Sequence, residues 1–253
     1  MTLVAAFRCR DGGILLCADR EENDGYAKKE VDKIYHFSCE SPKGSKAICE
    51  FFIAGSGPSK TIGKAYIAIC NSLRNAAESG VNLATEHKSY IENALTEIHE
   101  QDAKILKRWG MNLLVVVAPH IPGNSPQLYR TEKAELCPEA LYAAEGNGQI
   151  ISNYLASRLY THGLQKPALA ALAAFIFREV EYSRVGVGLG LDMWFIHEGD
   201  KSRNEIPPIP AAEIQAGVPS LKDAVYSYWE RHLVVPDWIN IPLAGSGQPG
   251  RAN

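Results

Sequence analysis

The chain begins with two short apolar runs separated by polar and glycine residues. The runs are Leu3–Phe7 and Ile14–Ala18, and the Gly12-Gly13 pair lies between them. Short apolar runs on either side of a glycine-rich turn are typical of a β-hairpin. A polar loop is expected next, and the apolar run at Ile34–Phe37 predicts a third strand.

The rest of the chain alternates between strand-like and helix-like segments. Five further segments predict strands: Ala47–Ala54, Met111–Ala118, Gln127–Arg130, Ala140–Ala144 and Leu191–Ile196. Apolar residues recur at helical spacing in five others: Pro58 to Gly80, about His87 to Trp109, Gln149 to Tyr160, Pro167 to Tyr182, and Ser220–Leu233. Strands in groups and helices in pairs indicate an α+β protein with helices packed outside two stacked sheets.

The C-terminal part is less regular. The proline-rich stretch from His197 to Gly217 predicts a long loop, and Gly245 to Asn253 predicts a disordered tail. No internal repeat or interdomain linker is evident. We therefore expect a single domain over residues 1–244, followed by the tail at 245–253.

Composition narrows the possible partners and the compartment. The 253 residues are 46% hydrophobic and 22% charged, with a formal net charge of −3, which argues against a nucleic-acid or anionic-membrane partner. No secretory signal and no span of transmembrane length is present. The six cysteines form no C-x-x-C pair, and the seven histidines form no H-E-x-x-H spacing. We expect a cytoplasmic protein with free thiols, no metal and no cofactor.

Thr2 is the first candidate catalytic residue. If Met1 is removed, the hydroxyl and a free α-amine occupy one residue and can serve as nucleophile and base. An α-amine has a reference pKa near 8, so it is partly unprotonated at neutral pH. Threonine at position two is common, however, and the residue alone says little about function.

Asp19 and Lys33 can support such a nucleophile. A lysine ammonium near the Thr2 amine would lower the pKa of that amine, and Asp19 could pair with the lysine and hold it inside the protein. The structural alternative is that Asp19 ends one strand as a turn residue and Lys33 begins another in solvent.

Four motifs in order resemble a known family. They are Thr2, the run Gly13 to Asp19, the run Val31-Asp32-Lys33-Ile34, and the run Ala54-Gly55-Ser56-Gly57. This order resembles the β subunits of the proteasome and the related bacterial ring protease that an ATPase drives, both N-terminal-nucleophile hydrolases. The resemblance extends from Thr2 to about Trp194.

The resemblance implies a fold, an assembly and a set of site residues. The implied fold is a four-layer αββα sandwich of two antiparallel sheets flanked by helices. It implies self-assembly into a homo-oligomeric ring, with a possible ATPase partner, and removal of Met1 would suffice for maturation. Asp19 and Lys33 match the family's pair beside the nucleophile, Gly55 matches the oxyanion-hole glycine, and Ser183 matches a serine near the last glycine turn.

The chain departs from the family at several of these positions. Asn147 stands where a Gly-Ser-Gly motif usually has serine, and Val180 stands where an aspartate precedes the matched serine. Glu181 is one position away from that place. Glu21 lies where the family usually has arginine. Because these groups help to orient the terminal amine, their replacement bears on whether the site is active.

Two glycine-containing segments resemble phosphate-binding motifs only in part. The Ala54–Thr61 segment follows a strand and precedes a helix, as a P-loop does, but Ala54 and Ser59 replace required glycines and Pro58 removes a donor. The Gly186–Gly190 run precedes a strand instead of opening a helix, unlike a dinucleotide fingerprint.

The sequence therefore predicts a threonine-type endopeptidase acting on peptides or unfolded protein, with Thr2, Asp19, Lys33, Gly55 and Ser183 in the site. The apolar residues Val31 and Ile53, expected beside the substrate, favour apolar cleavage sites. A non-catalytic assembly subunit and a small-molecule amidase of the same superfamily are the alternatives. Cys17 is expected to be a buried structural thiol.

Overall fold

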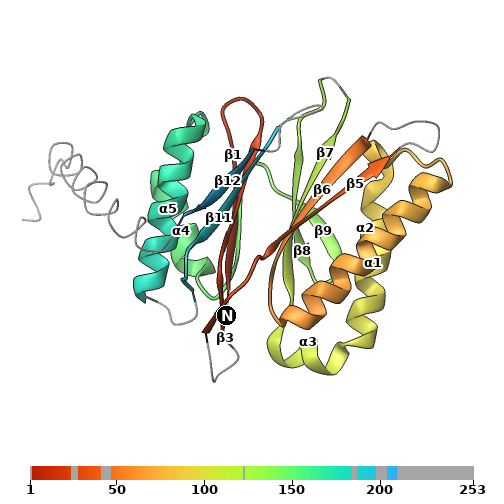
Figure 1. Ribbon diagram of the computed structural model, residues 1–253, viewed down its shortest axis with the longest axis horizontal. Helices are drawn as coiled ribbons and strands as arrows, with labels where there is room; N and C mark the ends of the chain where they lie inside the picture. The colour runs from red at the N-terminus through yellow and green to blue at the C-terminus, as the bar shows by residue number, and fades with distance from the viewer. Residues whose placement is uncertain are drawn as a thin grey trace, which may run out of the picture. The chain divides into compact units, whose positions relative to one another are not determined.

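Two antiparallel five-stranded sheets, with helices on their outer faces, make up the computed structural model of the chain (Figure 1). It describes residues 2–23, 28–40, 47–121, 123–183, 187–197 and 204–209. All of these residues belong to one unit, Met1–Val218. The helix expected at Ser220–Leu233 and the tail at 245–253 lie outside the described residues, so the boundary at 244 stays a prediction.

The first sheet contains the N-terminus of the chain. Its order is β10-β1-β2-β11-β12, with strands β10 (Tyr142–Gly146), β1 (Leu3–Arg8), β2 (Ile14–Asp19), β11 (Leu191–Ile196) and β12 (Asn204–Ile209). The hairpin predicted around Gly12-Gly13 is confirmed, because β1 and β2 pair antiparallel from Val4–Ala18 to Arg8–Ile14. The same hairpin places Thr2 and Asp19 at one end of adjacent strands.

The second sheet lies against the first. Its order is β5-β6-β7-β8-β9, with strands β5 (Ile34–Glu40), β6 (Ala47–Ser56), β7 (Asn112–Pro119), β8 (Gln127–Glu132) and β9 (Glu135–Pro138). A separate two-stranded ribbon consists of β3 (Glu21–Asn23) and β4 (Lys28–Glu30).

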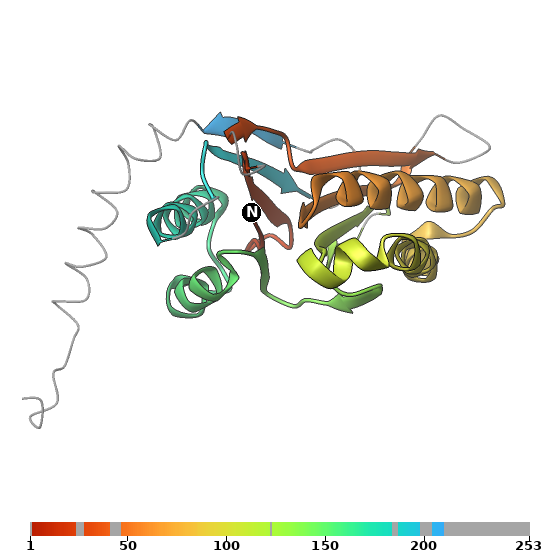
Figure 2. The same cartoon turned by 90° about the horizontal axis from the view of Figure 1, so that it is seen from below.

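Helices cover the outer face of each sheet (Figure 2). The second sheet carries α1 (Ser59–Glu78) and α2 (Leu83–Gln101), continued by the short α3 (Ala103–Trp109). The first sheet carries α4 (Gln149–Leu159) and α5 (Lys166–Ser183). The predicted α+β sandwich with four layers, αββα, is therefore the observed fold.

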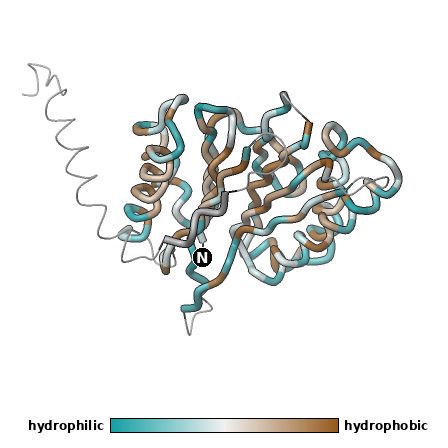
Figure 3. The backbone as a smooth tube through the Cα atoms, turned by 45° about the horizontal axis from the view of Figure 1, so that its top comes forward, coloured by the Kyte–Doolittle hydropathy of each residue, from teal (hydrophilic) through white to brown (hydrophobic). Residues whose placement is uncertain are grey.

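Strand β7 shows how the sequence specifies this layering. Alternating side chains point to opposite faces of a strand. Leu114 and Val116 pack in the core between the two sheets, whereas Leu113 and Val115 pack in the core under the helices. Because both faces are covered, the strand is continuously apolar, and Figure 3 shows the hydrophobic positions concentrated in such strands.

Some predicted elements differ from the structure. The helix expected from His87 to Trp109 is two helices that meet at Asp102, whose carboxylate accepts bonds from Thr61 Oγ1 at 3.0 Å and Lys64 Nζ at 2.8 Å. Ile105, an apolar residue within the predicted helix, is 44% exposed. Pro58 occupies the N-cap of α1 instead of its first position.

Four short strands were missed. The polar loop expected after Asp19 contains β3 and β4, and β9 follows a tight turn after β8. The long loop expected from His197 contains β12, which pairs with β11. These strands are polar or proline-containing, so periodicity alone does not identify them.

The described residues also bear on membranes, metals and thiols. None of the helices in this part of the chain is long and apolar enough to cross a membrane. Within the same residues, no group of three or more His, Cys, Asp or Glu side chains is placed to hold a metal ion. All six cysteines are free; five, including Cys17, are buried.

Candidate active site

Thr2 directly precedes β1 and is buried. Its backbone oxygen accepts a hydrogen bond from the Asn147 N–H at 2.9 Å, and the next residue, Leu3, is paired with Gly146 of β10. The backbone around Thr2 is therefore fixed by the turn that follows β10.

Gly146 allows the turn after β10 to lie close to the Thr2 backbone. Its φ is +110°, and a Cβ at this position would lie 2.0 Å from the Thr2 oxygen and 2.7 Å from Ser56 Oγ. Any side chain would collide with the Thr2 backbone, and L-residues rarely adopt this φ. Two residues of the Gly146-Asn147-Gly148 turn thus approach the Thr2 oxygen: Asn147 through its N–H, and Gly146 through the absence of a side chain.

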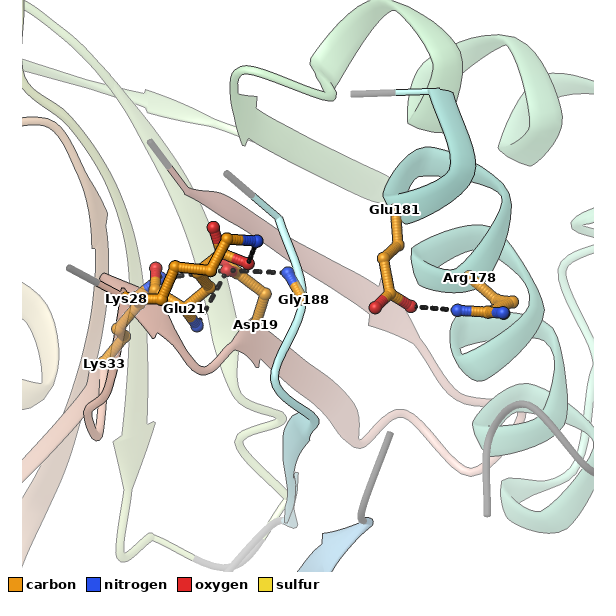
Figure 4. A network of polar contacts seen from close by, with 7 residues as sticks. All are labelled: Asp19, Glu21, Lys28, Lys33, Arg178, Glu181 and Gly188. Atoms are coloured by element: carbon orange, nitrogen blue, oxygen red, sulfur yellow. Dashed lines mark hydrogen bonds and ion pairs between the residues drawn. The ribbon is translucent and has the colours of Figure 1, made fainter. Parts of the chain in front are cut away.

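Asp19, at the end of β2, connects the beginning of the chain to Lys33. Its Oδ1 accepts the Leu3 N–H at 2.7 Å, and its Oδ2 accepts Lys33 Nζ at 3.0 Å. The same Oδ2 accepts the N–H of Glu21 at 3.1 Å and that of Gly188 at 3.4 Å (Figure 4). One carboxylate thus holds the backbone next to Thr2, the lysine and the segment after α5.

Lys33 points into the protein. Its side chain is 9% exposed, and the ammonium bonds to Asp19 and to the backbone oxygen of Glu21. The expectation that Asp19 and Lys33 form a pair beside the first strand is met by these contacts. The alternative, a lysine in solvent, does not describe this residue.

Burial shifts the pKa of both members of the pair. It raises the pKa of Asp19 to about 6, although the Lys33 ammonium and the Leu3 N–H both act to lower it. Burial also lowers the pKa of Lys33, against the attraction of Asp19. Both shifts favour the neutral forms, as expected for charges removed from water. Proton movement between such groups costs less than it does between the same groups in solvent.

Arg20 is a part of the site that sequence reasoning missed. Its guanidinium pairs with Glu30 at 2.8 Å, Asp32 at 3.1 Å and Asp192 at 2.6 Å. Glu30 and Asp32 lie on the segment that leads into Lys33, so Arg20 ties this segment to the end of β2. Two acidic residues at positions 30 and 32, together with the arginine that follows Asp19, were the available signal.

Glu21 also has a partner that was not foreseen. It is 2% exposed, and its Oε2 pairs with Lys28 Nζ at 2.9 Å across the β3–β4 ribbon. The Glu21 side chain thus links β3 to β4, while the Glu21 backbone oxygen accepts a hydrogen bond from Lys33.

Gly55 lies in β6, opposite Leu113 of β7. A Cβ at position 55 would lie 2.8 Å from both Ile62 Cγ2 and Leu113 Cδ2, so close packing of α1 against the sheet requires a glycine here. This packing accounts for the residue without catalysis, and the oxyanion role of Gly55 stays a prediction.

The structure also describes Val180, a departure from the resemblance, and Ser183, a position that matches it. Val180 is fully buried, and its Cγ1 would lie 2.2 Å from a Cβ at Gly148, so apolar packing fills the place where an aspartate was expected. Ser183 is exposed, and its hydroxyl donates to the Glu179 oxygen on its own helix at 2.9 Å. The hydrogen bonds found for Ser183 therefore do not join it to Asp19 and Lys33.

The positions expected to contact a substrate side chain behave differently from each other. Ile53 has no exposed surface and packs in the core beneath the helices, so it does not border a substrate pocket. Val31 is partly exposed, and its N–H bonds to the Arg20 oxygen at 3.0 Å. The argument for apolar cleavage sites therefore loses one of its two residues.

Comparisons with known proteins agree on the fold. No protein-family model matches the chain, and no curated protein matches it in sequence. Among solved structures, an Anbu mutant from Hyphomicrobium sp. strain MC1 is similar, with 16% identity, a TM-score of 0.73, and 91% of this chain and 99% of that chain covered. Anbu from Yersinia bercovieri, described as an ancestral beta-subunit, has 14% identity, a TM-score of 0.71 and coverages of 90% and 97%.

A third similar structure is the Anbu complex from Pseudomonas aeruginosa, described as a helical assembly. It has 15% identity, a TM-score of 0.72, and 94% of this chain and 100% of that chain covered. These matches correct the resemblance inferred from sequence: the assignment to the proteasome β subunits is wrong, because the matching structures are Anbu proteins, a distinct family, and no family model supports it. At these identities the likeness concerns architecture alone, and the chain has the fold of the Anbu proteins.

Proposed function

We propose that the chain is a threonine-type N-terminal-nucleophile hydrolase that cleaves peptide bonds through Thr2 after removal of Met1. The observation that carries the proposal is the bridge made by Asp19, which binds the Leu3 N–H with one oxygen and Lys33 with the other. This bridge links a buried lysine to Leu3, the first residue of β1, which directly follows Thr2.

The reaction needs a free amine at Thr2. While Met1 is attached, the Thr2 nitrogen is an amide and cannot accept a proton; after its removal the amine can serve as the base. The Thr2 hydroxyl then attacks the peptide carbonyl, and the amine takes the hydroxyl proton and returns it to the leaving amine. Water releases the resulting ester and regenerates Thr2.

Lys33 and Asp19 act on this amine through charge. A nearby ammonium disfavours a second positive charge, which lowers the pKa of the Thr2 amine towards neutrality. Asp19 holds the lysine in place. The Gly55 N–H is proposed as the oxyanion donor, a contribution of about 3–4 kcal/mol in enzymes where such donors have been removed.

A non-catalytic subunit is the second candidate function. Val180 and Asn147 favour it, because an apolar side chain and an amide replace groups expected to orient the amine. Self-assembly belongs to both candidates, since the similar Anbu complex from Pseudomonas aeruginosa is described as a helical assembly. Light scattering of the purified chain would measure its assembly state.

N-terminal sequencing and one substitution separate the two functions. We expect the purified chain to begin at Thr2 and to hydrolyse peptides, Thr2→Ser to retain hydrolysis, and Thr2→Ala to lose it with an unchanged circular dichroism spectrum. Retention of Met1, or no hydrolysis by the wild type, would favour the non-catalytic subunit. Equal hydrolysis by Thr2→Ala would exclude Thr2 as the nucleophile. Comparison of peptides with small amides tests whether the enzyme is instead an amidase.

A further inference from the structure

Helix α3 and the first turns of α1 lie side by side at one end of the second sheet. The side chains of Thr61 and Lys64 both bond to Asp102, which directly precedes α3. At the other end of α3, a Cβ at Gly57 would lie 2.7 Å from the Gly110 oxygen. The first turns of α1 therefore run antiparallel to α3, with the start of one beside the end of the other.

These two segments carry a surplus of positive charge. Residues 57–64 and 102–110 contain one acid, Asp102, and five basic residues: Lys60, Lys64, Lys104, Lys107 and Arg108. Lys64 is paired with Asp102, whereas the other four are exposed and form no ion pair with any residue that the structure describes. Within the same part of the chain, the exposed Glu97 and Glu100 of α2 form no ion pair with them either. Since the whole chain has a formal net charge of −3, the surplus is local.

Two apolar side chains are exposed beside these cations. Trp109 is 65% exposed and Ile105 is 44% exposed, and residues at i and i+4 lie on one face of a helix. The Arg108 guanidinium lies 4.9 Å from the centre of the Trp109 ring, a cation–π contact that holds the arginine next to the indole. Trp and Arg are among the residue types that contribute most to binding at protein interfaces. We call the following residues the basic patch: Lys60, Lys104, Lys107, Arg108 and Trp109.

The basic patch borders the segment that approaches Thr2. Ser56, the neighbour of Gly57, is paired with Asn112 of β7, and its Oγ would lie 2.7 Å from a Cβ at Gly146. The same Cβ would lie 2.0 Å from the Thr2 oxygen. Figure 1 shows α3 at the end of the sandwich where β1 begins. A peptide held by the patch would therefore lie at the end of the sandwich that contains Thr2.

The charge and size of the patch favour an acidic peptide as its partner. Carboxylates can pair with the four cations, and an apolar side chain can pack on the exposed indole. A nucleic acid or an anionic membrane would extend beyond the patch and meet a chain whose net charge is negative. Because single exposed ion pairs are weak, the peptide needs several of them at once.

We propose that the basic patch binds acidic polypeptide segments beside the Thr2 site. Binding itself does not depend on catalysis. Its consequence for substrate choice rests on the proposed hydrolase function: peptides with acidic residues near the cleaved bond should be bound more tightly as substrates.

Fluorescence anisotropy with the full chain tests the binding. The probe is a fluorescein-labelled peptide in which glutamates flank one phenylalanine. We expect saturable binding that weakens as salt rises from about 0.01 to about 0.15 M, because the Debye length falls from about 30 to about 8 Å. The same peptide with glutamine in place of glutamate should not bind. No binding, equal binding of both peptides, or stronger binding of RNA or of phosphatidylglycerol vesicles would overturn the proposal.

Substitutions locate the site on the protein. Arg108→Glu should weaken peptide binding by roughly three- to tenfold, because an attractive exposed pair becomes repulsive, and Trp109→Ala should weaken it as well. The matched controls are Arg158→Glu and Tyr154→Ala on α4, because Arg158 also lies over an exposed aromatic ring, that of Tyr154, at 5.7 Å. The controls should bind the peptide as the wild type does. Equal effects of the two sets of variants would overturn the patch as the binding site.

Peptide hydrolysis tests the consequence for substrate choice. In the wild type, the KM of an acidic peptide should be lower than that of its glutamine analogue, with kcat unchanged, and Arg108→Glu should remove the difference. Equal KM values in the wild type would refute the link between the patch and substrate choice. Absence of hydrolysis by the wild type would instead refute the proposed hydrolase, and the anisotropy measurement would still test the patch.

Discussion

Asp19 and Lys33 form a buried ion pair, with Oδ2 and Nζ 3.0 Å apart and side chains 1% and 9% exposed. A buried charge is costly unless it is paired, and removal of one partner leaves the other uncompensated. The pair is therefore expected to matter for folding and, if the proposed function holds, for catalysis, and the two effects can be separated.

Single and double substitutions of the pair make this separation. Asp19→Asn leaves Lys33 without its anion and should cost about 3–5 kcal/mol of unfolding free energy. The double variant Asp19→Asn with Lys33→Met removes both charges and should recover part of that loss. Both variants should lack peptide hydrolysis. Urea unfolding and a peptide assay measure the two effects.

Two outcomes would contradict these roles of the Asp19–Lys33 pair, and the first comes from the double variant. If it hydrolyses peptides as fast as the wild type, the ion pair supports the fold and has no part in catalysis. If Asp19→Asn is as stable as the wild type, Asp19 does not compensate the buried lysine.

Gly146 should be intolerant of any side chain. Gly146→Ala places a methyl group 2.0 Å from the Thr2 oxygen, so we expect loss of several kcal/mol of stability and of activity. Gly163→Ala is the matched control: φ is also positive, at +134°, but nothing lies within 4 Å of the added Cβ. Thermal unfolding should show a much larger loss of stability for Gly146→Ala than for Gly163→Ala. Equal losses would mean that backbone strain alone destabilises both variants.

Glu145 should make stability depend on pH. Burial raises its pKa to about 7, although Arg130 acts to lower it. Because the folded pKa exceeds the ordinary value of 4.5, the folded state binds the proton more tightly. The stability that Glu145 contributes to the folded state is fully present below about pH 4.5 and is lost as the pH rises through about 7.

Glu145→Gln tests this dependence. The amide cannot ionise, so the variant should not lose stability as the pH rises. The unfolding free energy of the variant minus that of the wild type should therefore be about 1–3 kcal/mol larger at pH 8 than at pH 5. Urea unfolding at the two pH values measures the difference. A difference between variant and wild type that is the same at both pH values would exclude Glu145 as the titrating group.

Hydrolysis should fall as the medium becomes acidic. With the pKa of Asp19 near 6, protonation of its carboxyl below that pH removes the charge that pairs with Lys33. A pH profile of kcat/KM should therefore show an acidic limb near pH 6. A rate that stays constant down to pH 5 would show that ionisation of Asp19 is not required.

The sequence predicted the sandwich because its apolar periodicity is strong where elements pack on both faces. Strand β11 matches its predicted bounds, and the hairpin around Gly12 pairs as expected. The prediction failed for the β3–β4 ribbon, whose residues are all polar, and for β12, whose two consecutive prolines are not typical of a strand. It also predicted one helix from about His87 to Trp109, although the structure has two helices with Asp102 between them.

Parts of the site were harder to predict than the fold. The Asp19–Lys33 pair was found because both residues belong to ordered motifs. The contacts of Arg20 and Gly146 join segments far apart in the chain, such as the ion pair between Arg20 and Asp192. Residue types and spacing do not encode such contacts, and only the folded arrangement shows them.

The central claim is that Thr2, freed of Met1, is the nucleophile. Its most direct test is intact-mass and peptide-mapping mass spectrometry of the chain after treatment with a peptide-like electrophile. The account predicts a chain that begins at Thr2 and carries one adduct on that residue, absent in Thr2→Ala and in Lys33→Met. A chain that keeps Met1, or an adduct located on another residue and unchanged in Thr2→Ala, would contradict it.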